Sequence, residues 1–112
     1  MSAVQVRRWT RQEYDRMIEA GVLTPDDRVE LIDGEILSTT PQGSPHATAV
    51  LLVQDALRVS FGRDVHIRAQ LPIALGLDSE PEPDVAVVAG SVRDYRDAHP
   101  QSALLEIGRA HV

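Results

Sequence analysis

One unbroken apolar run constrains the fold of this chain more than any other feature. Residues 84–88 read Asp-Val-Ala-Val-Val, with no polar residue between the aliphatic ones. A strand exposed on one face would alternate apolar and polar residues, whereas a continuous run is typical of a strand covered on both faces. The run therefore predicts a strand in the interior of the domain.

Two local signals divide the N-terminal part into a helix and a hairpin. Thr10 and Glu13 have the spacing of a capping box, which predicts a helix through Ala20. Further along, Asp33-Gly34 is a strong two-residue hairpin signal between predicted strands at 28–32 and 35–39. Judged by pattern alone, Glu30 and Glu35 belong to the solvated face of this hairpin.

A second helix and three further segments complete the predicted order. Ser44 and Pro45 form an N-cap and a first-turn proline, and an apolar stripe continues to residues 61–62. Leu51 and Leu52 widen the stripe, which predicts a helix covered on more than one side. We expect one long strand at 64–75, bent near Pro72, and then, after the apolar strand, a short polar helix at 91–98 and a strand resuming at 103–105. This order predicts a mixed α/β sheet.

Composition limits the class of protein. The chain has 112 residues, enough for one domain, and it contains no cysteine, so disulfides and thiolate metal sites are excluded. The N-terminus lacks a signal peptide and no apolar stretch reaches membrane-spanning length, so we expect a cytoplasmic protein. A net charge of −6 argues against nucleic-acid binding through bulk electrostatics. All 11 basic residues are arginine, which excludes any mechanism that needs a lysine of this chain.

The stretch EPEPDVAVV carries the clearest chemical signal. Asp84 opens the buried strand, the prolines at 81 and 83 restrict the loop before it, and Glu80 and Glu82 add acid. A carboxylate on rigid backbone suits Mg²⁺, which takes oxygen ligands and activates water for phosphodiester hydrolysis. The alternative is an ordinary acidic turn before a strand. His46 lies in the first turn of the second helix, where a histidine is more often a surface or cap residue than a ligand.

Three stretches together, RVELIDGEI, SPHATAV and SEPEPDVAVV, resemble the Uma-two family of restriction-type endonucleases, within the PD-(D/E)xK nuclease superfamily. The resemblance runs from about Trp9 to Leu105. It implies a restriction-endonuclease-like fold and a Mg²⁺-dependent nuclease that acts on DNA. It also implies that Asp84 is a metal ligand and that Glu30 and His46 lie near the catalytic site.

The chain departs from the family after Leu105. The family continues with a strand that carries a second metal-binding glutamate, followed by a lysine, and this chain has neither that strand nor any lysine. We therefore expect residues 1–105 to be the N-terminal portion of one nuclease-like domain, inactive as given. Residues 106–112, EIGRAHV, are the translation of GAG ATC GGA AGA GCA CAC GTC. After its first base this is the start of a common sequencing-library adapter, so the segment is interpreted as a non-native read-through tail in which Glu106 imitates the missing ligand.

Three functions remain open at this point. The first is a Mg²⁺-dependent endonuclease of which this chain is a fragment, with DNA as substrate and a homodimer by analogy with related nucleases. The second is a non-catalytic binding or regulatory module that kept only the nuclease-like half. The third is an acidic α/β domain whose Pro-Asp pair is a turn. Metal binding at Asp84 separates the third from the first, and the sequence beyond Leu105 separates the first from the second.

Overall fold

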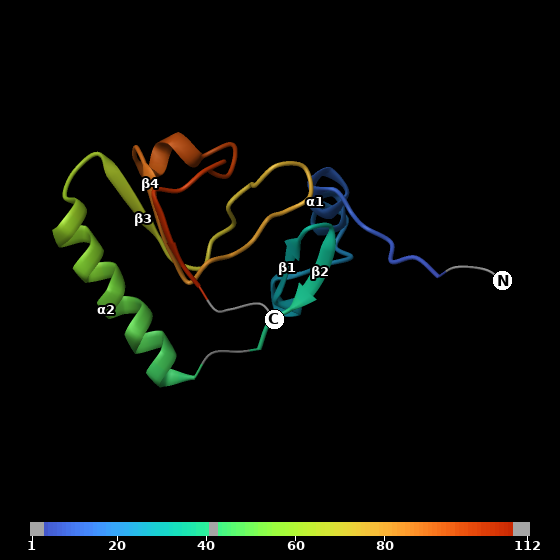
Figure 1. Cartoon of the computed structure of the whole chain (residues 1–112), viewed down its shortest axis with the longest axis horizontal. Helices are drawn as coiled ribbons and strands as arrows, with labels where there is room; N and C mark the ends of the chain where they lie inside the picture. The colour runs from blue at the N-terminus through green and yellow to red at the C-terminus, as the bar shows by residue number, and fades with distance from the viewer. Residues whose placement is uncertain (1–3, 41–42, 109–112) are drawn as a thin grey trace.

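The computed structural model describes residues 4–40 and 43–108 and confirms the mixed α/β class. Its strands form two antiparallel sheets, in the orders β1-β2 and β3-β4-β5. Figure 1 shows the long helix α2 alongside the larger sheet, with α1 and the hairpin at the other end of the molecule. The elements are α1 (Arg11–Glu19), η1 (Pro25–Asp27), β1 (Val29–Ile32), β2 (Glu35–Ser38), α2 (Ser44–Phe61), β3 (Val65–Arg68), β4 (Val85–Ala89), η2 (Val92–Tyr95) and β5 (Leu105–Ile107).

The N-terminal helix and hairpin form where the sequence predicts them. Thr10 and Glu13 exchange the two hydrogen bonds of a capping box, each through its side chain to the other's backbone N–H. In the hairpin, Asp33 and Gly34 have φ of 48° and 80°. Two left-handed residues in a row are the requirement of the type I′ turn, whose twist matches that of the flanking strands. Both predicted strands are therefore confirmed, each to within one residue at its ends.

Strand β4 is buried on both faces, as its apolar run predicts. Val85 and Val87 pack with Val50 of α2 and Ile67 of β3. On the opposite face, Ala86 and Val88 pack with Ile73, and with the partly buried side chains of Leu75, Tyr95 and Ala103. Because successive side chains of a strand point to opposite faces, this one strand joins both apolar clusters.

The second helix differs from its prediction in two respects. Gly43, not Ser44, is the N-cap, so that Ser44 already lies inside the helix and Pro45 follows it in the first turn. Leu51 and Leu52 are 62% and 65% exposed, so the predicted cover on more than one side is wrong. Only the stripe that includes Val50 packs against the sheet, because α2 lies on the sheet as a single outer layer.

The predicted strand at 64–75 is confirmed only over its first part. Strand β3 ends at Arg68, and Gln70 takes φ of 54°, a left-handed conformation that turns the backbone out of the strand. Beyond this turn the segment bonds to other loops: Ile73 N–H donates to the Pro81 carbonyl and Ala74 N–H to the Pro100 carbonyl. The hydrogen-bond partners of residues 73 and 74 therefore lie in loops and not in a neighbouring strand.

The last strand lies two residues later than predicted. Strand β5 spans Leu105–Ile107, so Glu106 and Ile107 of the predicted tail take part in it. Leu105 pairs with Val87, Glu106 with Ala86 and Ile107 with Val85. Residues 109–112 of that tail lie outside the described residues, and whether the tail is native stays a prediction.

Candidate functional site

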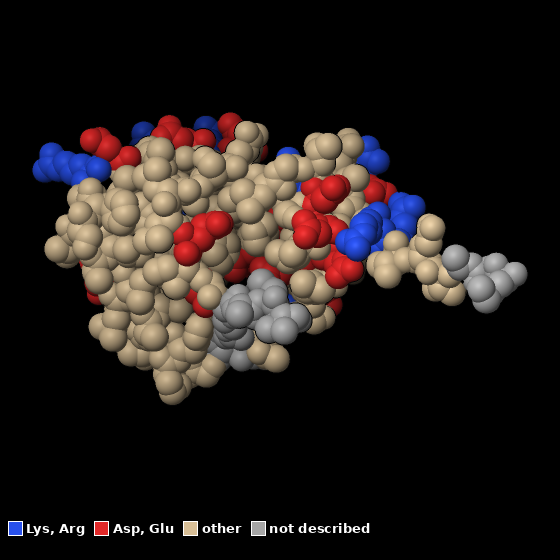
Figure 2. Space-filling model, in the orientation of Figure 1, with Lys and Arg blue, Asp and Glu red and all other residues tan. Residues whose placement is uncertain are grey.

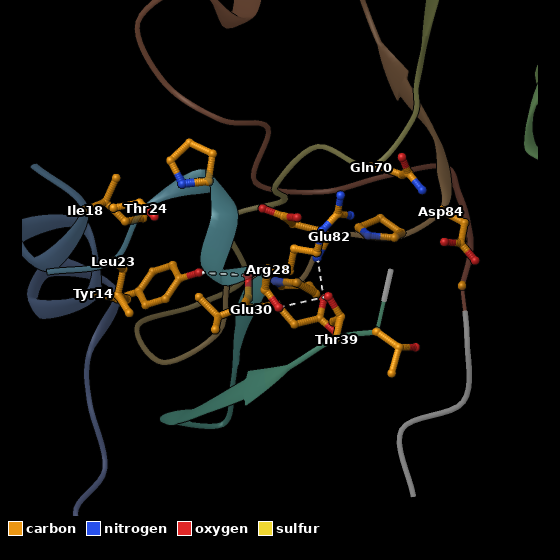
Figure 3. A pocket seen from close by; sticks show the side chains of 16 residues that line it. Tyr14, Ile18, Leu23, Thr24, Arg28, Glu30, Thr39, Gln70, Glu82 and Asp84 are labelled. Carbon is orange, nitrogen blue, oxygen red and sulfur yellow. Dashed lines mark hydrogen bonds between the residues drawn. The ribbon is translucent and has the colours of Figure 1, made fainter. Parts of the chain in front are cut away.

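A cavity of about 430 Å³ lies between the hairpin, α1 and the start of β4. Figure 3 shows that the cavity is lined by Glu30 of β1, Glu82 of the proline-rich loop and Asp84. Tyr14 lies at the end opposite Asp84. Figure 2 shows acidic side chains in the central hollow of this face of the molecule, whereas the arginines lie mainly toward the outer edge of the molecule. The site is therefore acidic, and three segments far apart in the sequence build it.

Asp84 is fixed at the rim of this cavity by its backbone. Gln70 N–H points at the carbonyls of both Pro83 and Asp84, at 3.0 and 3.2 Å. The proline at 83 restricts the backbone just before the aspartate. The Asp84 side chain is 15% exposed, so one carboxylate stands at the start of a rigid strand with limited access to water.

His46 lies beside Asp84. It projects from the first turn of α2, and its Nε2 atom is 3.3 Å from Asp84 Oδ1, close enough for an ion pair when the imidazole is protonated. This Nε2 atom is buried and makes no hydrogen bond within the described residues. The histidine therefore lies close enough to orient the Asp84 carboxylate.

Glu30 has a different role from the one that its pattern predicts. Its side chain is not solvated: the residue is only 3% exposed, and its Oε2 atom accepts a hydrogen bond of 2.7 Å from Glu82 N–H. The loop at 79–82 covers β1, where Leu31 and Glu80 form an antiparallel bridge. Glu35, the other glutamate assigned to the solvated face, does keep a side chain that is 44% exposed.

The charges of the cavity disfavour an anion. Burial, and then the charge of Glu30, raise the pKa of Glu82. Burial also raises the pKa of Tyr14 to about 12, helped by nearby carboxylates such as Glu82. Both shifts have the sign expected where acidic groups gather at low dielectric. Arg28 also lines the cavity, but its single positive charge is outnumbered by the three carboxyls, so a bound cation would favour the approach of a phosphate.

The residues present do not complete a metal site. In the described part of the chain, no three histidine, cysteine or acidic side chains are grouped so as to hold a metal ion. Asp84 offers one carboxylate, while Mg²⁺ sites in proteins use one or two carboxylates with waters and substrate oxygens. Among the predicted site residues, Asp84 and His46 lie together, whereas Glu30 lines the same cavity and bonds to Glu82 instead.

The strand register shows which residue faces Asp84. Glu106 pairs with Ala86, two residues along the chain from Asp84, which makes it a diagonal neighbour of Asp84, and its imitation of a second ligand stays an interpretation. Continuing the register by one residue places Gly108 opposite Asp84, and a Cβ atom built on Gly108 would lie 4.0 Å from the Asp84 nitrogen. The nearest contact of that Cβ is 3.8 Å, an ordinary van der Waals distance. Position 108 therefore has room for a side chain beside Asp84.

A family model described as "Uma2: Putative restriction endonuclease" matches residues 11–107. The chain belongs to the Uma2 family. The match covers most of the chain and includes every element from α1 to β5, which supports a nuclease at the level of the family. No curated protein and no solved structure matches the chain. Within the described residues of this Uma2 protein, no helix is long and apolar enough to cross a membrane.

Two contributors to the site escaped the sequence analysis. Gln70 holds the loop before Asp84, but a glutamine with positive φ has no sequence signal, unlike glycine or asparagine. Gly108 was hidden because the register of β5 was unknown. The sequence predicted Glu82 only as a nearby acidic residue, whereas in the structure its backbone N–H donates to the buried Glu30 carboxylate.

Proposed function

We propose that this chain is the N-terminal part of a Mg²⁺-dependent DNA endonuclease and that Asp84 is its metal ligand. The observation that carries the proposal is the rigid placement of Asp84 at the rim of an acidic cavity, 3.3 Å from His46, in a member of a restriction-endonuclease family. When bound, Mg²⁺ would supply a Lewis acid and a more acidic water for phosphodiester hydrolysis.

The chain's own residues have separate roles in this proposal. Asp84 presents the carboxylate, and His46 positions it through the 3.3 Å contact. Glu30 is a positioning residue that acts through the loop, since its carboxylate holds the N–H of Glu82 two residues before Asp84. DNA is the substrate of the whole enzyme, the location is cytoplasmic, and pairing of two copies would allow both strands to be cut.

We further propose that residues 1–105 are one part of the nuclease domain and that residues 106–112 are a read-through tail. The support is the agreement of EIGRAHV with the adapter codons and the absence of lysine from the chain. Without a second carboxylate facing Asp84, and without a lysine to stabilise developing charge, we expect no nuclease activity from the chain as given.

The alternative is a non-catalytic nuclease-like module that binds or regulates. Gly108 at the position opposite Asp84 favours it, because a binding module needs no second ligand there. Sequencing the source locus through and beyond the codon of Leu105 distinguishes the two functions. A strand with a glutamate followed by a lysine supports the enzyme, whereas a genomic EIGRAHV followed by a stop codon supports the module.

Binding of Mn²⁺, as a spectroscopic substitute for Mg²⁺, tests the proposed site directly. We expect Gly108→Glu to bind Mn²⁺ at least about tenfold more tightly than the unmodified chain, because it adds a second charged oxygen ligand beside Asp84. Asp84→Ala in the Gly108→Glu background should remove the gain. Glu35→Gln, at an exposed carboxylate that does not line the cavity, is the control and should change nothing. Equal binding by all variants would contradict the assignment of Asp84.

A further inference from the structure

A second cavity, of about 560 Å³, lies between α1 and the segment that follows η2. It shares Tyr14, Ile18 and Glu82 with the first cavity, but neither Asp84 nor Glu30 lines it. Its lining comprises Arg11, Tyr14, Asp15, Ile18, Glu19, Pro72, Ala74, Glu80, Glu82, Tyr95, Arg96, Asp97, Ala98, His99 and Gln101. The proposed nuclease function gives this cavity no role.

The inner end of the second cavity is negatively charged. Arg96 does not offset this charge, because its side chain is 86% exposed and it lies 4.0 Å from Asp97. Arg11 donates through its Nε atom to the Gly76 carbonyl and keeps its positive charge, which offsets only part of the negative charge around Glu80. Burial, followed by the charge of Arg68, lowers the pKa of His99, so that this imidazole is neutral at pH 7. The carboxyls of Asp15, Glu80 and Glu82 therefore dominate.

Glu80 is the residue that points to a ligand. It is 2% exposed, and its buried Oε1 atom finds no hydrogen-bond partner within the described residues. Burial, and next the charge of Asp15, raise the pKa of Glu80 to about 7. A buried carboxylate oxygen without a donor is costly. Either a proton shared with Asp15 or an N–H donor from a bound cation would satisfy it.

We propose that the second cavity binds a primary alkylammonium group against Glu80 and Asp15. An ammonium brings three N–H donors and one positive charge, which suits two carboxyls that lie side by side. The rings of Tyr14 and Tyr95 line the same space and offer apolar surface to the attached carbon chain. The ligand is a free polyamine or a lysine side chain supplied from outside residues 1–112, which contain no lysine.

Calorimetric titration of the full chain with spermidine, with Nα-acetyl-lysine methylamide and with the neutral control 1-butanol tests the proposal. We expect saturable binding of at least one ammonium and none of butanol. Tighter binding of spermidine indicates a polyamine site, and tighter binding of the lysine derivative indicates a partner protein. Binding should strengthen from pH 6 to 8 as Glu80 ionises among Asp15, Arg11 and Glu82, the charged groups that face it.

Charge-neutralising variants locate the binding. Glu80→Gln keeps the shape of the side chain and should weaken ammonium binding at least about tenfold, the scale of a charged hydrogen bond. Asp15→Asn should do the same and serves if Glu80→Gln fails to fold. Asp26→Asn, at an exposed carboxylate outside the cavity, and Asp84→Ala should leave binding unchanged. Undiminished binding by both cavity variants, or no saturable binding of either ammonium, would overturn the proposal in favour of a shared proton alone.

Discussion

Two buried regions of this molecule are held together by different chemistry. Around β4, the buried side chains are aliphatic, and Val85, Val87 and Val88 are at most 1% exposed. At the junction of the hairpin with the proline-rich loop, the buried side chains include two carboxyls, Glu30 and Glu80, at 3% and 2%. The two regions are equally buried, but only the second should make stability depend on pH, because carboxyls titrate and aliphatic side chains do not.

The junction is polar because its backbone needs partners. Prolines at 81 and 83 donate no hydrogen bonds, which leaves Glu82 N–H to find an acceptor, and the Glu30 carboxylate accepts it. Leu31 and Glu80 complete the contact through their backbones. We expect the stability contributed by the aliphatic core around β4 to be independent of pH, and the junction to make the region beside Asp84 sensitive to pH. Four measurements test this difference.

The largest effect should come from truncating the centre of β4. Val87 is fully buried, so Val87→Ala should cost about 3 kcal/mol through lost burial and the cavity that remains. The loss should be the same at pH 5 and pH 8, because the residues of its hydrophobic cluster do not titrate. Urea denaturation followed by circular dichroism at both pH values measures it. A loss of stability that differs between the two pH values would contradict the pH independence expected of the core around β4.

The next effect concerns the pH dependence of stability. Because the pKa of Glu80 is raised from 4.5 to about 7, the folded chain keeps a proton in this window that the unfolded chain releases. The contribution of the Glu80 carboxyl to the free energy of unfolding is therefore fully present below pH 4.5, and it is lost as the pH rises through 7. Between pH 5 and 7 the loss should be about 2 kcal/mol.

Glu80→Gln should flatten the unfolding free energy across that window, since an amide does not titrate. Asp26→Asn, at an exposed carboxylate, should keep the slope of the original chain. Because Glu80 and Asp15 interact, the transition belongs to the pair, and Asp15→Asn should move its midpoint downward. An unchanged slope in Glu80→Gln would show that the junction does not carry the pH dependence.

A smaller effect should follow from removing the acceptor beneath the loop. Glu30→Ala leaves Glu82 N–H without its partner and should cost about 1.5 kcal/mol. Glu30→Gln retains an acceptor oxygen and should restore most of that loss. Amide hydrogen exchange at Glu82 is the specific measurement: we expect faster exchange in Glu30→Ala and near-original exchange in Glu30→Gln. Equal protection in all three chains would exclude the bond.

The smallest effect should come from Leu105, the direct partner of Val87 in the register of β4 and β5. It is 38% exposed, so Leu105→Ala should cost less than about 1 kcal/mol, against about 3 for Val87→Ala. The two variants remove apolar atoms from paired positions of one sheet, three carbons at Leu105 and two at Val87, so a smaller loss at Leu105 would reflect its exposure. Comparable losses would mean that β5 is covered in solution by something that the described residues do not include.

The sequence predicted the parts of the fold whose causes are local. The capping box of α1 and the Asp33-Gly34 turn depend on residues within a few positions of one another, and both were confirmed. The apolar run of β4 was also sufficient, because its composition matches only a covered strand. In the candidate site, the sequence identified Asp84 and, through the family resemblance, His46 and Glu30 as its neighbours.

The errors arose where the partner lies far along the chain. The strand predicted over 64–75 is interrupted at Gln70, whose N–H bonds to the loop before Asp84, and the cap of α2 lies one residue earlier than expected. Leu51 and Leu52 looked like core residues because their hydropathy says nothing about whether another layer covers them.

The sequence by itself was sufficient for the start of α1, the hairpin turn, the interior strand and the carboxylate at its entrance, because short-range sterics and hydrogen bonds set these features. Tertiary structure decided that Glu30 is buried, that Glu80 lies beside Asp15, and that Gly108 rather than Glu106 faces Asp84. Each of these depends on which distant segment covers a residue, or on a register fixed by pairing across the sheet. The covering segment and the register cannot be predicted from neighbouring residues, because the free energy that selects them comes from the packing of the whole domain.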